Sequence, residues 1–129
     1  DTTWSRGLGD VYKRQRYPFE IWIAPNRRTS NIFELSQNEQ KDLAELMLDA
    51  SKSLDKVFDD PMPYTLAWQL SPKGYENSYH FHVCFQPIRR SKTKLKYLAG
   101  VEQISGFFLV DLPPERSARI LRGEELPDE

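Results

Sequence analysis

The sequence predicts an α+β fold in which a mostly antiparallel sheet packs with one long helix and a short C-terminal helix. Two stretches of period-two hydrophobicity flank a turn at residues 73–78, which indicates a strand on either side of that turn. A single long stretch with helical period precedes them, up to residue 58. No repeat or linker interrupts the 129 residues, of which 39% are hydrophobic, so one domain with one core is expected.

The first strand is expected at residues 17–24, where apolar side chains alternate with a mixed set until Pro25 ends the strand. One face of this strand carries Phe19, Ile21 and Ile23, and the other carries Glu20, Trp22 and Ala24. After a polar loop, Ser36 and Glu39 have the spacing of a capping box, which predicts that a helix starts there. Its apolar stripe runs up to the terminating residues 59–61 and consists of Leu43, Leu46, Met47, Ala50, Leu54, Val57 and Phe58.

Further strands are expected at residues 64–70 and 79–86, both from alternation of apolar and polar side chains. In the second of these, the polar face carries His80, His82, Cys84 and Gln86. The apolar run at residues 107–110 predicts a short buried strand. Two prolines and an acid at residues 113–115 predict a final helix that continues to about Arg122.

His80 and His82 are the two histidines of the chain, and the strand period places them on one face. Their expected separation of about 7 Å would let two imidazoles share a metal ion, or let one orient the other against a phosphate. The alternative is that both are half-buried polar residues on a solvated sheet face. A zinc site takes four ligands, and Cys84 supplies at most a third in this row.

A basic loop follows this strand, and Tyr97 adds an aromatic surface beside it. The loop carries Arg89, Arg90, Lys92, Lys94 and Lys96. Such a loop suits a phosphorylated ligand, although a solvated basic loop with no ligand gives the same pattern. On sequence grounds alone, Glu102 is an exposed acid. Cys84 is either a nucleophile or a buried, inert thiol, and the second alternative is the more common one.

Composition excludes several classes of function. A formal net charge of -1 and a pI near 6.2 lack the basic excess of a dedicated nucleic-acid binder. No apolar run has the roughly 18 residues that a membrane span needs, so no membrane partner is expected. With one cysteine and no signal peptide, a reducing cytoplasm is the expected location.

The first fifteen residues form a separate segment. Residues 5–15, SRGLGDVYKRQ, resemble the translation of a transposase-loaded sequencing adapter, whereas the alternative is a natural flexible N-terminus. We therefore expect residues 1–15 to be a non-native tail outside the fold. Residues 16–129 are then a fragment in which Arg16 is an interior residue of a longer protein.

Several segments together resemble the C-terminal half of galactose-1-phosphate uridylyltransferases, which belong to the histidine triad superfamily. They cover residues 17–122 and read PFEIWIAPNRR, SQNEQKDLAELM, DPMPYTLAW, YHFHVCFQPIRRSKTKLKYLAGVE and PPERSARILR. The most specific part is the His-x-His pair together with the basic loop and the segment KLKYLAGVE that follows it. The resemblance implies a histidine-triad-like domain.

The resemblance also implies a function and a set of site residues. Members of the family have two similar halves and exchange a uridylyl group between UDP-glucose and hexose 1-phosphates through a uridylyl-histidine. The nucleophile and most zinc ligands lie in a His-Pro-His half that this chain lacks, so the resemblance implies no catalytic residue here and no activity of the fragment alone. By resemblance, Lys96, Tyr97, Val101 and Glu102 contact a nucleotide sugar bound by the neighbouring subunit of a homodimer. By resemblance also, His82 and His80 correspond to a second metal position.

The chain departs from the family pattern at this second metal position. Gln69 stands where many relatives have a histidine ligand, and Cys84 stands where a carboxylate or histidine is common, which argues against a complete second site. Three alternative functions stay open. They are an adenylyltransferase or phosphorylase acting on ADP-sugars or dinucleoside polyphosphates, a histidine triad hydrolase with His82 as nucleophile, and a non-catalytic nucleotide-sugar-binding module.

Overall fold

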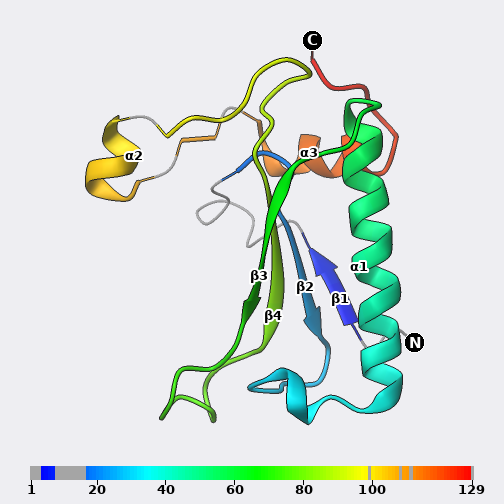
Figure 1. The fold of residues 1–129 in the computed structure, drawn as a ribbon, viewed down its shortest axis with the longest axis vertical. Helices are drawn as coiled ribbons and strands as arrows, with labels where there is room; N and C mark the ends of the chain where they lie inside the picture. The colour runs from blue at the N-terminus through cyan, green and yellow to red at the C-terminus, as the bar shows by residue number, and fades with distance from the viewer. Residues whose placement is uncertain (1–3, 8–16, 99, 108, 111, 129) are drawn as a thin grey trace.

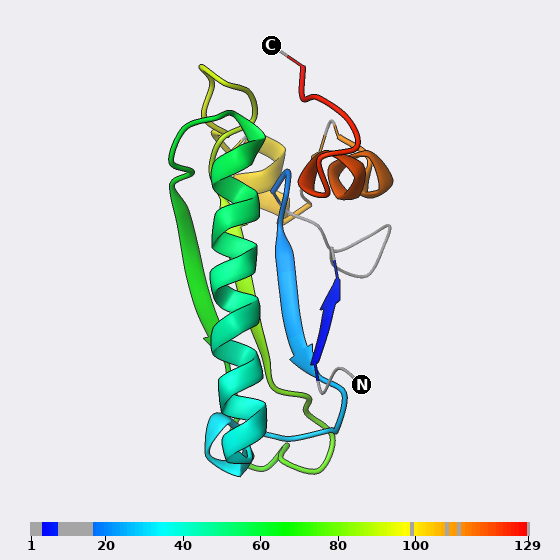
Figure 2. The same cartoon turned by 90° about the vertical axis from the view of Figure 1, so that its right-hand side faces the viewer.

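A long helix packed along one face of an antiparallel sheet gives the protein two layers (Figures 1 and 2). The computed structural model describes residues 4–7 and 17–128, except 99, 108 and 111. Within this part, the sheet has four strands in the order β1-β2-β4-β3, all pairs antiparallel. The elements are β1 (Trp4–Gly7), β2 (Ile21–Pro25), η1 (Ile32–Glu34), α1 (Gln37–Val57), β3 (Tyr64–Gln69), β4 (His82–Pro87), α2 (Gly100–Ser105) and α3 (Pro114–Leu121). The predicted α+β class is confirmed.

The core lies between α1 and one face of the sheet. Strand register places Ile21 and Leu66 beside Phe85, so the apolar sets of three strands share this face. The helix contributes the buried stripe that its periodicity predicts, including Leu43 and Leu54. No helix in the described part has the combined length and hydropathy needed to cross a bilayer.

The capping box predicted at the start of α1 is present. The Ser36 hydroxyl accepts from the Glu39 amide at 3.2 Å, and the Glu39 carboxylate accepts from the Ser36 amide at 3.1 Å. Both otherwise unpaired amides are satisfied in this way. The helix ends at Val57, and Asp59 then takes a left-handed φ of 51° before Pro61 prevents any continuation.

Two predicted strands start later than expected. Residues 17–20 form a turn in which Phe19 has a left-handed φ of 61°, so β2 begins at Ile21. The third predicted strand begins at His82, not at residue 79. The amide of Phe81 donates to the Thr29 carbonyl at 2.7 Å, so that part of the chain bonds to a loop and not to the sheet ladder.

The predicted buried strand at residues 107–110 is wrong. Among its described residues no strand forms, and Phe107 and Leu109 are 73% and 54% exposed. The backbone of Leu109 bonds to the side chains of Lys96 and Glu102, so it has no need of a neighbouring strand. Sequence patterns also gave no indication of η1 or α2. The strand β1 lies within residues 1–15, the segment expected to be non-native, and it pairs with β2.

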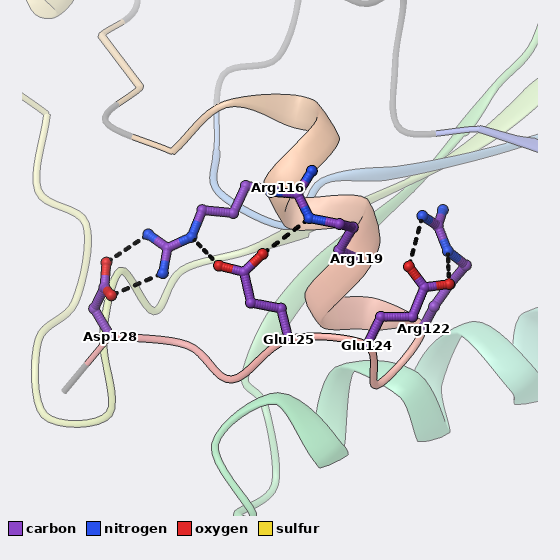
Figure 3. A network of polar contacts seen from close by, with 6 residues as sticks. All are labelled: Arg116, Arg119, Arg122, Glu124, Glu125 and Asp128. Carbon is purple, nitrogen blue, oxygen red and sulfur yellow. Dashed lines mark hydrogen bonds and ion pairs between the residues drawn. The ribbon is translucent and has the colours of Figure 1, made fainter.

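The predicted C-terminal helix is present as α3, with Pro114 in its first turn. The chain after it returns along the helix and is held by ion pairs (Figure 3). Arg116 binds Glu125 at 2.6 Å and Asp128 at 2.7 Å, and these contacts lower the pKa of both carboxyls. Because these side chains are partly or fully open to solvent, each pair contributes little to stability.

Candidate functional site

His82 lies at the sheet face that α1 does not cover, and His80 precedes the strand that carries it. Register places Trp22 beside Cys84 and Gln69 beside His82, which is the face opposite the core set. Helix α2 stands away from the sheet at the end of a long connection (Figure 1). Two groups of polar side chains follow from this arrangement: one around His82 on the sheet, and one around Lys96 at the base of α2.

Three groups contact the His82 imidazole: one backbone carbonyl and two aromatic rings. Its Nδ1 lies 3.0 Å from the carbonyl oxygen of His80. The Trp22 ring stacks on the imidazole with centroids 4.8 Å apart and 22° between planes. The Tyr79 ring also packs nearly parallel to it, at 6.1 Å and 25°. Within the described residues, the structure records a hydrogen bond for His82 Nδ1 and none for its Nε2.

His80 is arranged differently. It precedes β4, and its Nε2 lies 2.7 Å from the Pro25 carbonyl oxygen. The predicted row of three side chains on one strand therefore holds only for His82 and Cys84. Among the described residues, no three His, Cys, Asp or Glu side chains are grouped closely enough to hold a metal ion. His80 and His82 could supply two nitrogen ligands, and a zinc ion would need the others from elsewhere.

Cys84 is 3% exposed, so its predicted burial is confirmed. Its thiol donates to Glu20 Oε1 at 3.3 Å. Glu20, which is 1% exposed, also accepts from Trp22 Nε1 at 2.8 Å and from the Tyr17 amide at 3.3 Å. Sequence analysis did not single out Glu20. Its only sequence signal is a carboxylate two residues before a tryptophan, because a buried acid needs donors such as an indole N–H.

The second group is a buried ion pair at the base of α2. Lys96 Nζ lies 3.1 Å from Glu102 Oε2, and the two side chains are 7% and 2% exposed. Leu109 donates its amide to Glu102 at 3.1 Å and accepts from Lys96 at 2.6 Å. The interpretation of Glu102 as an exposed acid is therefore wrong, because a lysine six residues earlier pairs with it.

The remaining predicted residues lie around this pair. Tyr97 is 80% exposed, and Val101 lies in α2 with a side chain outside the described part. In the basic loop, Lys92 is exposed whereas Arg89 binds Asp60 at 2.7 Å. The arrangement therefore combines an ammonium group, a carboxylate and an exposed aromatic ring within one short segment. These groups can neutralise a phosphate oxygen, accept from sugar hydroxyls and cover a ring, respectively.

Comparisons with known proteins agree with this fold. A galactose-1-phosphate uridylyltransferase from Thermotoga maritima is 36% identical over 114 residues, covering 86% of this chain and 36% of that protein. A solved uridylyltransferase structure matches with a TM-score of 0.84 at 30% identity, covering 96% of this chain and 39% of that one. A Zn-bound histidine triad family protein from Mycobacterium smegmatis shares the fold, with a TM-score of 0.62 at 15% identity and coverage of 96% and 78%.

These matches describe part of a longer relative. The chain spans 36% of the Thermotoga maritima protein and 39% of the solved uridylyltransferase chain. Residues 11–129 match the family model described as galactose-1-phosphate uridyl transferase, C-terminal domain. That match includes strands β2, β3 and β4, helix α1, the Lys96–Glu102 pair and α3. The chain belongs to the galactose-1-phosphate uridyl transferase C-terminal domain family.

Proposed function

We propose that this chain is the substrate-contacting C-terminal half of an enzyme that transfers a uridylyl group between UDP-glucose and a hexose 1-phosphate. The observation that carries the proposal is the family match over residues 11–129. The identity of 36% to a galactose-1-phosphate uridylyltransferase supports the same reaction. The covalent step belongs to the half that precedes this one, so this chain contributes binding and not the nucleophile.

In this proposal, the segment around α2 contacts the nucleotide sugar across the interface of a homodimer. Lys96 neutralises a diphosphate oxygen, Glu102 accepts hydrogen bonds from sugar hydroxyls, and Tyr97 covers a ring. Val101 precedes Glu102 in α2 and belongs to the same set of contact residues. Because Lys96 and Glu102 bind each other at 3.1 Å, substrate contacts with these two side chains would replace that contact.

The proposal assigns zinc mainly to the preceding half. Here, His82 Nε2 and His80 Nδ1 are the nitrogens not engaged by a backbone carbonyl, and they would be the two ligands that this chain offers. The buried Cys84 donates to Glu20, so we do not count its sulfur as a ligand.

The test uses the full-length protein, purified with its preceding half. It should exchange labelled galactose 1-phosphate into UDP-galactose in the presence of UDP-glucose, whereas this chain alone should not. Exclusive turnover of ADP-glucose would contradict uridylyl transfer and favour an adenylyl-transferring enzyme. Binding of UDP-glucose without exchange would favour a non-catalytic binding module. Phosphoramidate hydrolysis by this chain alone, lost in His82→Ala, would instead indicate a hydrolase.

A pair of matched variants tests the role of the loop. Lys96→Met in the full-length enzyme should lower kcat/KM for the nucleotide sugar by about 10- to 100-fold, the range for a hydrogen bond to a charged group. Lys92→Met removes a nearby exposed charge and should leave kcat/KM within about twofold. Equal effects of the two variants would contradict a direct role of Lys96.

A further inference from the structure

We propose that Trp22 and Tyr79 are positioning residues, which hold the His82 imidazole in one orientation so that its Nε2 keeps a free electron pair. Under the proposed function, a metal ion bound with ligands from elsewhere would accept that pair. Contacts of the ring on the open sheet face set this orientation, and they do not depend on the transferase reaction. Neither aromatic residue is among the residues that the resemblance implies for substrate or metal.

The protonation pattern of the ring follows from its hydrogen bond. A backbone carbonyl oxygen can only accept, so the ring nitrogen 3.0 Å from the His80 carbonyl must carry the proton. A neutral imidazole has one N–H, and His82 therefore carries it on Nδ1 and has its lone pair on Nε2. The same reasoning gives His80 the opposite tautomer, because its Nε2 lies 2.7 Å from the Pro25 carbonyl.

The hydrogen bond alone does not determine the ring plane. Rotation about the bond that joins an imidazole to its Cβ is broad, with no sharp staggered wells. Stacking against Trp22 at 22° and Tyr79 at 25° fixes that plane. The hydrogen bond to the His80 carbonyl then places the Nδ1 edge of the ring toward the backbone. Both kinds of contact are needed to present Nε2 in one direction.

Trp22 is itself anchored. Its indole N–H donates to Glu20 Oε1 at 2.8 Å, and Glu20 is 1% exposed with further donors from Cys84 and Tyr17. A charged acceptor in a buried position holds its donors more tightly than an exposed one does. The buried carboxylate thus orients the indole, and the indole orients His82.

The test is nitrogen NMR on the full 129-residue chain at pH 8.5, because tautomers are distinguished in the neutral ring. Long-range proton–nitrogen spectra of the wild-type chain should show His82 protonated on Nδ1 and His80 protonated on Nε2. Trp22→Leu should convert His82 to a mixture in which the Nε2-protonated form rises at least severalfold. His80 should not change, which makes it an internal reference.

Trp68→Leu is the matched control, because Trp68 stacks on Phe81 and lies on the core side of β3. It should leave both histidine tautomers as they are. If Trp22→Leu does not fold, two other variants give the same test. Tyr79→Leu removes the second aromatic ring, and Trp22→Phe keeps an aromatic ring but removes the indole N–H.

Two results would overturn the inference. One is a wild-type His82 protonated on Nε2. The other is a His82 that keeps its Nδ1-protonated tautomer, to the wild-type extent, in the Trp22 and Tyr79 variants. The readout needs no metal, nucleotide or turnover, so a failure here is separate from a failure of the proposed transferase activity.

Discussion

Replacing Glu102 with glutamine removes the charge that compensates Lys96 where both side chains are nearly buried, at 7% and 2% exposure. Breaking a buried ion pair from one side costs about 3–5 kcal/mol, because the remaining charge is left without its partner. Glutamine can still accept from the Leu109 amide, so we take the lower end, about 3 kcal/mol. Helix α2 stands away from the sheet (Figure 1). The chain can therefore relieve this cost by local opening of the loop that carries α2 and the Lys96–Glu102 pair.

Hydrogen exchange measures that opening. About 3 kcal/mol corresponds to about a hundredfold faster exchange at the Lys96 and Gly106 amides, whose own acceptors are backbone carbonyls that the substitution leaves in place. Amides of β2 and β4 should keep their wild-type rates. The control is Glu115→Gln, an exposed acid in the first turn of α3, which should change neither set. Wild-type exchange of the loop amides in Glu102→Gln would refute the assignment of the pair as the contact that closes this loop.

Three further predictions concern helix α1 and the sheet, which support the candidate site. Ser36→Ala should lower the free energy of unfolding by about 1 kcal/mol in urea denaturation, because it removes the N-cap of α1; no change would contradict the cap's role. The hydrogen bond from Arg27 holds the pKa of Glu39 below its ordinary 4.5, so its contribution to stability is present above that value and is lost as pH falls through the lower folded pKa. Glu39→Gln should therefore flatten the acid limb of the stability–pH profile, and an unchanged limb would argue against it. The Cys84 thiol, 3% exposed, should react with a thiol reagent only on unfolding, and rapid labelling of the native chain would contradict its burial.

Features that depend on local spacing could be predicted from the sequence. The capping box uses two residues three positions apart, and the core faces of β2 and β4 follow from strict alternation. The helix stop at residues 59–61 needs only proline chemistry. Each of these features depends on residues within one helical turn or one strand, so tertiary contacts do not alter it.

Features that depend on residues distant in sequence could not be predicted from local patterns. An apolar run such as residues 107–110 is typical of a buried strand, but here Leu109 bonds to two side chains from earlier in the chain. The burial of Glu102 depends on Lys96 in the same way. Period alone also could not show that Phe19 takes a left-handed φ and shortens β2.

The same distinction between local and distant contacts applies to the candidate site. The family resemblance singled out Lys96, Tyr97 and Glu102 as candidates, and the structure brings Lys96 and Glu102 into contact. They did not indicate that Trp22 stacks on His82, because that contact joins two strands far apart in sequence. The identities of the remaining metal ligands and of the nucleophile belong, under the proposed function, to the preceding half.

The most direct test of the central claim is a long read across the junction between Gln15 and Arg16 in the source DNA. The claim that this chain is the C-terminal half of a uridylyltransferase predicts an upstream frame that encodes a His-Pro-His motif and further zinc-ligand candidates. A start codon close to Tyr17 would contradict it, because the chemistry of the protein would then have to rest on His80 and His82 alone.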